Sequence, residues 1–300
     1  MTAEPLPFRL DLGAGDFLVG DQLPGDRPGY VFLHGLGSVR NGEKSASLLA
    51  HAAARGRAFV RIDMRGHGDS SGKLGCVKVS ELIADAVRLL ERTGPCLLVG
   101  SSLGALVGAF AAAARPELVR SLALLAPAVG FVTNLAGRLD EQGRMWTSEG
   151  LGFVVEPQVI EDGKQLDESG LPARLRVPTL VVHGTADEVI PVRAGERFFA
   201  AIPHARKELW LVPGGDHRLN TIADRDLDVA VLVLQLGHVN LRLALRADAD
   251  EGDFNPDRNN RPINGLALLD STRLDGRLEH RCEILVLLAH CTPLIWPTAM

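Results

Sequence analysis

The strongest constraint on the fold is an alternation of short apolar runs with longer amphipathic stretches between residue 29 and about residue 217. The apolar runs have the length and composition of buried strands and cover residues 30–35, 58–63, 96–101, 121–128, 179–184 and 208–215. The stretches between them, 43–56, 79–94, 103–119 and 192–205, carry apolar residues three and four apart, which predicts a helix in each. Gly56, Gly94 and Pro116 lie where the first three of these helices should stop. This order predicts an α/β fold, a mostly parallel doubly wound sheet flanked by helices.

Two parts of the chain depart from this alternation. Residues 130–171 show no clear strand or helix period, although they lie between two predicted core strands. We expect a small lid-like insertion over the strand ends; a passive surface excursion is the alternative. A capped apolar pattern predicts a last helix over 222–236, after which no motif is evident. The predicted domain therefore spans 1–236, and 237–300 form a C-terminal extension of unknown structure.

Composition excludes several classes of function. The 32 basic and 37 acidic residues give a net charge of −5, so no basic surface for nucleic acid is expected. No apolar run is long enough for a membrane span, and the N-terminus lacks the pattern of a signal peptide. The four cysteines are widely spaced and form no metal-binding pattern. We expect a cytoplasmic protein with reduced thiols and without a metal or an organic cofactor.

Ser102 is the candidate nucleophile. It lies in the sequence GSSLG at 100–104, directly after a predicted strand and directly before a predicted helix. A side chain raised on such a tight turn requires strained backbone angles, and glycines at 100 and 104 remove the neighbouring side chains that would collide. Ser101 is one residue out of register. The strand–turn–helix context supports the motif, which is weak evidence on its own.

The two partners that such a serine needs follow later strands. Asp187 comes directly after the strand at 179–184, and Glu188 is the alternative acid. His217 follows the last strand on a loop made flexible by two glycines, so it can reach back to Ser102. In parallel sheets these positions meet at the carboxyl edge, where ligands bind. We read His183 as structural and Asp216 as part of the loop.

The loop after the first predicted strand, HGLG at 34–37, has the position of an oxyanion loop. We expect the backbone amides of Leu36 and Leu103 to hold the negative charge that develops on a substrate carbonyl. His34 and Gly35 are predicted to lie at the substrate, with His34 acting mainly to orient the loop. In the insertion, Met145 and Trp146 are predicted to bind the acyl group, and Leu135, Leu151 and Phe153 are further candidates.

These motifs resemble the α/β-hydrolase superfamily over about residues 29–236. The resemblance is carried by HGLG at 34–37, DMRGHGDSSG at 63–72, GSSLG at 100–104, HGTADEVIP at 183–191 and GGDH at 214–217. A narrower similarity, which includes NGEK at 41–44, is to acyl-protein thioesterases and acyl-glucuronide esterases. The resemblance implies a serine hydrolase with a Ser102, Asp187 and His217 triad that cleaves esters or thioesters of small acyl compounds.

Several functions remain open at this level. We expect short-to-medium acyl chains, because a small lid gives little shelter to a long one. Cofactor-free perhydrolases and carbon–carbon bond hydrolases use the same triad, and some members of the superfamily bind small molecules without turning them over. The physiological substrate and the oligomeric state are not encoded in any motif that we find.

Overall fold

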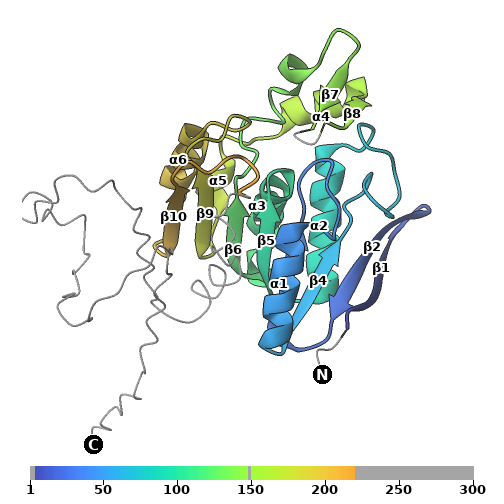
Figure 1. The fold of residues 1–300 in the computed structure, drawn as a ribbon, viewed down its shortest axis with the longest axis vertical. Coiled ribbons are helices and arrows are strands. Elements are labelled where there is room, and N and C mark those ends of the chain that lie inside the picture. Colours follow the sequence, from blue (N-terminus) through green and yellow to red (C-terminus); the bar gives the residue numbers. More distant parts are fainter. Residues whose placement is uncertain (1–3, 148–149, 220–300) are drawn as a thin grey trace, which may run out of the picture. The chain divides into compact units, whose positions relative to one another are not determined.

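The computed structural model describes residues 4–147 and 150–219. Over these residues the main feature is an eight-stranded sheet with the order β1-β2-β4-β3-β5-β6-β9-β10 (Figure 1). Its strands are β1 (Leu6–Gly13), β2 (Asp16–Leu23), β3 (Asp26–Leu33), β4 (Arg57–Ile62), β5 (Cys96–Ser101), β6 (Val119–Leu125), β9 (Thr179–Gly184) and β10 (Lys207–Val212). The six strands from β4 to β10 in this order are mutually parallel, and β2 pairs antiparallel with both β1 and β4. The predicted α/β class and mostly parallel sheet are confirmed.

The N-terminal hairpin of β1 and β2 was not among the predicted strands. Its sequence does carry a signal, because Phe8, Leu10 and Leu12 alternate with polar residues as one face of a strand does. Phe8 and Leu12 are buried against the core that lies under this edge of the sheet. A strand that is polar on its other face gives a weaker pattern than the continuous apolar runs of the central strands.

Helices cover both faces of the sheet. They are α1 (Glu43–Ala54), α2 (Val79–Thr93), α3 (Leu103–Ala114), α5 (Leu171–Arg174) and α6 (Val192–Ala201). Val31 and Leu33 point to the face covered by α2, α3, α5 and α6, whereas Tyr30 and Phe32 point to the face where α1 packs. Period-two alternation along β3 thus fills two separate cores.

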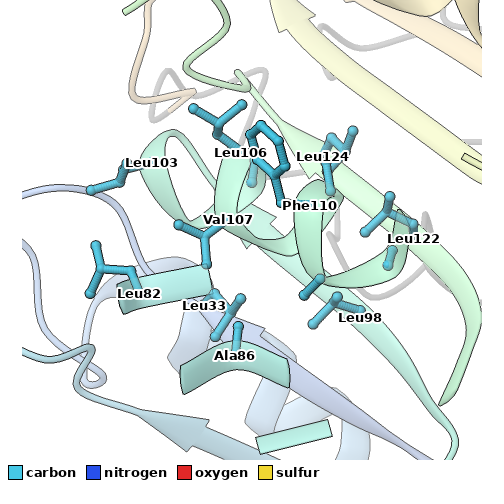
Figure 2. Close-up of a cluster of buried hydrophobic side chains, with 14 of the residues drawn as sticks. Leu33, Leu82, Ala86, Leu98, Leu103, Leu106, Val107, Phe110, Leu122 and Leu124 are labelled. Carbon is cyan, nitrogen blue, oxygen red and sulfur yellow. The ribbon is translucent and has the colours of Figure 1, made fainter. Parts of the chain in front are cut away.

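Helix α3 lies against the middle of the sheet. Every residue from Leu103 to Ala112 is buried, and the small side chains Gly104, Ala105 and Gly108 let the helix approach the strands closely. Figure 2 shows its Leu106, Val107 and Phe110 among strand residues of β3, β5 and β6. The helix ends at Ala114, just before Pro116, where the sequence predicts a stop, and Pro116 opens a short 3-10 turn (Pro116–Leu118) before β6.

The predicted insertion has regular structure of its own. Between β6 and β9 lie the 3-10 turn η2 (Leu135–Arg138), the antiparallel hairpin β7 (Arg144–Trp146) and β8 (Gly152–Val154), and helix α4 (Pro157–Gln165). In Figure 1 this group stands beyond one end of the sheet, above α2. A small cluster of Leu135, Met145, Val155 and Val159 forms its core.

Two predictions fall outside the described residues. The helix expected over 222–236 and the extension over 237–300 both lie there, so the boundary at 236 stays a prediction. Within the described part of the chain, no helix has the length and apolar character needed to cross a membrane.

Candidate active site

Ser102 occupies the strained turn that its motif predicts. Its backbone angles are φ 53° and ψ −115°, between the last residue of β5 and the first residue of α3. A Cβ on Gly100 would stand 2.4 Å from the carbonyl oxygen of Gly104, and one on Gly104 would stand 2.3 Å from that of Leu33. Both glycines are therefore required by close backbone contacts. The Ser102 amide donates to the Leu125 carbonyl at 2.8 Å, which ties the turn to the end of β6.

Three side chains from separate strand ends form one hydrogen-bonded chain. The Oγ of Ser102 lies 3.0 Å from Nε2 of His217, and Nδ1 of His217 lies 2.8 Å from Oδ2 of Asp187. The loops after β9 and β10 are joined directly, since the Ala186 amide donates to the Gly215 carbonyl at 2.9 Å. This junction holds Asp187 close to His217. Glu188, the alternative acid, is exposed, so the structure favours Asp187 as the partner of His217.

The carboxylate of Asp187 is buried and fully engaged. Its Oδ1 accepts the amides of Val189 and Ile190 at 2.9 and 2.7 Å. Its Oδ2 accepts from His217, and Nε2 of His183 lies 3.2 Å from the same oxygen. Burial by itself raises the pKa of Asp187, but the hydrogen bonds from His183 and His217 outweigh it and hold that pKa well below its usual range. The group is an anion at neutral pH.

Two backbone amides next to Ser102 are open. Gly35 lies against the serine, because a Cβ there would be 3.3 Å from the Ser102 Cβ. Leu36 follows it in this loop. Leu103 is the first residue of α3, and the N–H groups of a helix's first turn have no partner within the helix. Among the described residues neither amide donates a hydrogen bond. The two amides predicted as oxyanion donors are thus free to bind an oxygen.

Two cavities of different character adjoin this group. The first, of about 320 Å³, is open and has a mixed lining with more polar than apolar surface; it includes Ser102, His217, Ser38, Asn41, Lys44 and Arg218. The second, of about 50 Å³, is apolar and lies beneath the insertion; its lining includes Leu36, Leu103, Phe131, Leu135, Met145 and Phe153. Leu36 lines both, so the oxyanion loop separates them.

Of the residues predicted to bind substrate, some line a cavity next to Ser102 and others point to the surface. Gly35 and Met145 line the polar and the apolar cavity, respectively. Trp146 does not belong with them: it is 59% exposed, lines neither cavity, and its ring packs on Gly152 across the hairpin. Leu151, at 47% exposed, also points away. This corrects the expectation for Trp146, and the reason is the strand period: its neighbour Met145 takes the inward face.

His34 lines the polar cavity but uses its ring within the protein. Its Nε2 accepts the Met64 amide at 2.9 Å and its Nδ1 lies 2.8 Å from the Gly35 carbonyl. Burial, followed by the nearby His67, lowers the pKa of His34 to about 4. No ring nitrogen is left for a ligand, so the imidazole braces the oxyanion loop, and direct binding of substrate by this ring does not fit the structure.

Comparison with known proteins agrees with this architecture. Residues 31–157 match the family model described as alpha/beta hydrolase fold, and residues 163–222 match one described as serine aminopeptidase, S33. The mouse (Mus musculus) mitochondrial palmitoyl-protein thioesterase ABHD10 is 30% identical over 227 residues, which cover 70% of this chain and 76% of the mouse protein. The chain belongs to the α/β-hydrolase family. The solved structure of mouse α/β hydrolase domain-containing protein 10 has a TM-score of 0.69 and 26% identity, covering 77% of this chain and 98% of that one.

This α/β hydrolase also resembles a bacterial enzyme. The pyrrolizixenacetamide deacetylase of Xenorhabdus hominickii is 34% identical over 218 residues, covering 59% of this chain and 80% of the deacetylase. The relatives are thus thioesterases and other acyl hydrolases. The mouse thioesterase carries the word mitochondrial in its name. The cytoplasmic location expected for this α/β hydrolase stays a prediction.

Several contacts that position the oxyanion loop of this hydrolase were not predicted. Nε2 of His67 accepts the Gly37 amide at 3.1 Å, and Asp63 accepts the Arg40 amide at 2.7 Å and also pairs with the Arg40 guanidinium. His67 and Asp63 belong to the DMRGHGDSSG motif, which the sequence identifies only as part of the family resemblance. Their residue types alone give no signal, because the partners lie 23 to 30 residues away in sequence.

Proposed function

We propose that this α/β hydrolase cleaves carboxylic esters or thioesters through a covalent acyl intermediate on Ser102. One observation carries the proposal: the Ser102 hydroxyl faces His217 at 3.0 Å, and the neighbouring amides of Leu36 and Leu103 donate to no other group in the described part of the chain. A nucleophile, a base held by an acid, and an oxyanion site are the parts that acyl transfer needs. No metal or organic cofactor enters the proposed reaction.

The hydrogen-bonding pattern supports a defined sequence of proton transfers. Because Asp187 is an anion, it accepts the Nδ1 proton of His217 and leaves Nε2 free to accept from Ser102. His217 takes the hydroxyl proton as Oγ attacks the carbonyl, and the amides of Leu36 and Leu103 hold the oxyanion. His217 then donates that proton to the leaving thiol or alcohol, and water repeats the two steps on the acyl-serine.

The two cavities support an orientation for the substrate. The leaving group must lie next to His217, which protonates it, and His217 lines the polar cavity. The acyl group then extends to the other side of the carbonyl, past Leu36 and Leu103 into the apolar cavity. We propose short-to-medium acyl chains, because that cavity is the smaller of the two. The thioesterase named among the relatives favours a thioester as one substrate class.

The test is covalent labelling followed by a substrate series. A fluorophosphonate probe is expected to label the wild type and Ser101→Ala but not Ser102→Ala or His217→Ala. Ser101 is a matched control because it adjoins the nucleophile and lines the same cavity. Nitrophenyl esters from acetate to palmitate, beside acyl-thioesters, then define the acyl preference. Folded wild type that takes no label would indicate a binding protein, and a maximum at palmitate would contradict the proposed chain length.

A further inference from the structure

We propose that His183 is a positioning residue: it holds the carboxylate of Asp187 in place against His217. This role rests on the proposed function, in which Asp187 acts on His217. His183 is near the end of β9, four residues before Asp187, and its side chain is completely buried. Its place on a predicted strand indicates a structural residue only. The geometry assigns it a direct contact with the acid.

The position of the proton on His183 follows from its neighbours. Nε2 lies 2.9 Å from the carbonyl oxygen of Ile190 and 3.2 Å from Oδ2 of Asp187. Both neighbours only accept hydrogen bonds, so Nε2 must carry the proton and donate. A bare Nε2 would face two oxygen lone pairs in a dry site, which is unfavourable.

The other nitrogen of His183 explains why this residue is a donor and not a second base. Nδ1 is buried and has no hydrogen-bond partner in the described part of the chain. It lies against the backbone of α6, where a Cβ on Gly195 would stand 2.3 Å away. A proton added to Nδ1 would find no acceptor and no space. His183 therefore presents one N–H, on Nε2, to Asp187 and Ile190.

The consequence is a shared oxygen. Oδ2 of Asp187 receives an N–H from each of two imidazoles, at 2.8 Å from His217 and 3.2 Å from His183. The donor from His183 fixes the carboxylate plane and neutralises part of the charge that His217 would otherwise experience. Removing it leaves the Oδ2 charge to His217 alone, which stabilises the imidazolium and makes His217 a stronger base.

Other charged groups lie around the pair but are not changed by a substitution at 183. Glu43, Lys44 and Arg218 line the cavity that His217 faces. Glu188 and Asp216, the sequence neighbours of the acid and the base, are exposed. His183 is the one titratable side chain besides His217 that contacts Asp187 among the described residues. A change in the titration of His217 would thus report on His183 itself.

The experiment compares four variants by the pH dependence of kcat/KM for a nitrophenyl butyrate substrate. In His183→Leu the acidic limb, which reports His217 in the free enzyme, should move upward by roughly half a pH unit or more. kcat should fall roughly tenfold with KM unchanged, because the carboxylate loses one of its clamps. His183→Gln places an amide N–H near the Nε2 position and should restore the wild-type limb.

Two further variants separate positioning from packing. Gly195→Ala keeps the histidine but pushes a methyl group onto Nδ1, so it should shift the limb in the same direction as His183→Leu. Thr179→Val changes another buried polar residue at the far end of β9 and should lower the melting temperature without moving the limb. An acidic limb that stays in place in both His183→Leu and Gly195→Ala, with only stability reduced, would overturn the proposal.

A direct titration keeps this test independent of the proposed activity. The His217 ring can be followed by NMR in wild type and His183→Leu without any substrate. An upward shift of its titration in the variant supports the positioning role even where no ester is cleaved. An unchanged titration would refute that role. A wild type that cleaves no ester or thioester would count against the proposed hydrolysis alone.

Discussion

The loops at the carboxyl edge of the sheet and the insertion above them are built differently. The loops carry Ser102, Asp187 and His217 and are held by backbone contacts closer than any added Cβ could tolerate. The insertion has a core of four buried residues, and its hairpin exposes Trp146 at 59% and Val154 at 52%. Close backbone contacts thus constrain the first region, whereas the second supplies the apolar wall of a cavity.

This difference indicates how the two regions divide the proposed function. Changes at the strand ends should abolish activity almost regardless of the acyl group, whereas changes in the insertion should alter which acyl groups are accepted. The four predictions below test that division.

The largest effect is expected for Asp187→Asn. The substitution preserves shape but replaces an acceptor of the His217 Nδ1–H with an amide that can hold the wrong tautomer. We expect kcat to fall by about 10⁴-fold, and the melting temperature to fall as well, because the amide NH2 replaces an oxygen that accepts from both His217 and His183. Hydrolysis of nitrophenyl butyrate measures this effect. Glu188→Gln, one residue away and exposed, is the control and should keep wild-type activity. Activity retained in Asp187→Asn would remove the acid from the proposed mechanism.

The next effect compares two glycines, one from each region. A Cβ on Gly104 would stand 2.3 Å from the Leu33 carbonyl, whereas one on Gly137 in η2 meets nothing within 4 Å. Gly104→Ala must therefore displace the turn that carries Ser102, and we expect about a hundredfold loss of kcat and about 2 kcal/mol loss of stability. Gly137→Ala should change both by little. Urea unfolding with parallel assays measures the pair, and equal effects would contradict the division.

Acid sensitivity should also come from the strand-end loops. The pKa of His34 is lowered to about 4 in the folded chain. In the unfolded chain the same residue binds a proton near pH 6.5. The unfolded state thus binds more protons between these values, and the free energy of unfolding falls as the pH drops, by up to about 3 kcal/mol from His34. His67, whose pKa burial also lowers, adds to this loss.

The measurement for that prediction is urea unfolding at pH 7 and pH 5. His34→Gln should be less stable than wild type at pH 7, because the amide cannot replace both ring contacts, to the Met64 amide and the Gly35 carbonyl, but it should lose less further stability at pH 5. His204→Gln, in the loop between α6 and β10, is the control and should leave the wild-type pH dependence intact. A wild-type stability that does not change between the two pH values would contradict the buried neutral state of His34.

The smallest effects are expected in the insertion. Met145→Ala enlarges the apolar cavity and should lower kcat/KM for hexanoate esters by roughly tenfold, with acetate esters little affected. Trp146→Ala, the adjacent residue on the outward face, should change neither substrate by more than about twofold. The ratio of hexanoate to acetate turnover distinguishes the two. Equal changes for both substrates in Met145→Ala would mean that this wall does not select the acyl group.

Much of this molecule could be predicted from local pattern. The order of the central strands and their helices follows from apolar periodicity, and the position of Ser102 follows from glycines on both sides of a strand-to-helix turn. Asp187 and His217 were chosen because parallel strands bring their carboxyl ends to one edge. The β1–β2 hairpin is not predicted because β1 is short and apolar on one face only, although the alternation of Phe8 and Leu12 with polar residues is its signal.

Sequence by itself therefore determined the central strands and helices, their order along the chain and the three strand ends at which the candidate site is built, because each of these depends on residues close together along the chain. Tertiary structure decided which neighbours share a hydrogen bond: His183 with Asp187 beside His217, and His67 with the oxyanion loop. It also decided that Met145 faces the cavity while Trp146 faces outward. These hydrogen bonds and side-chain orientations depend on how separate elements pack and on which face of a short hairpin points inward. Neither can be predicted from a local sequence pattern.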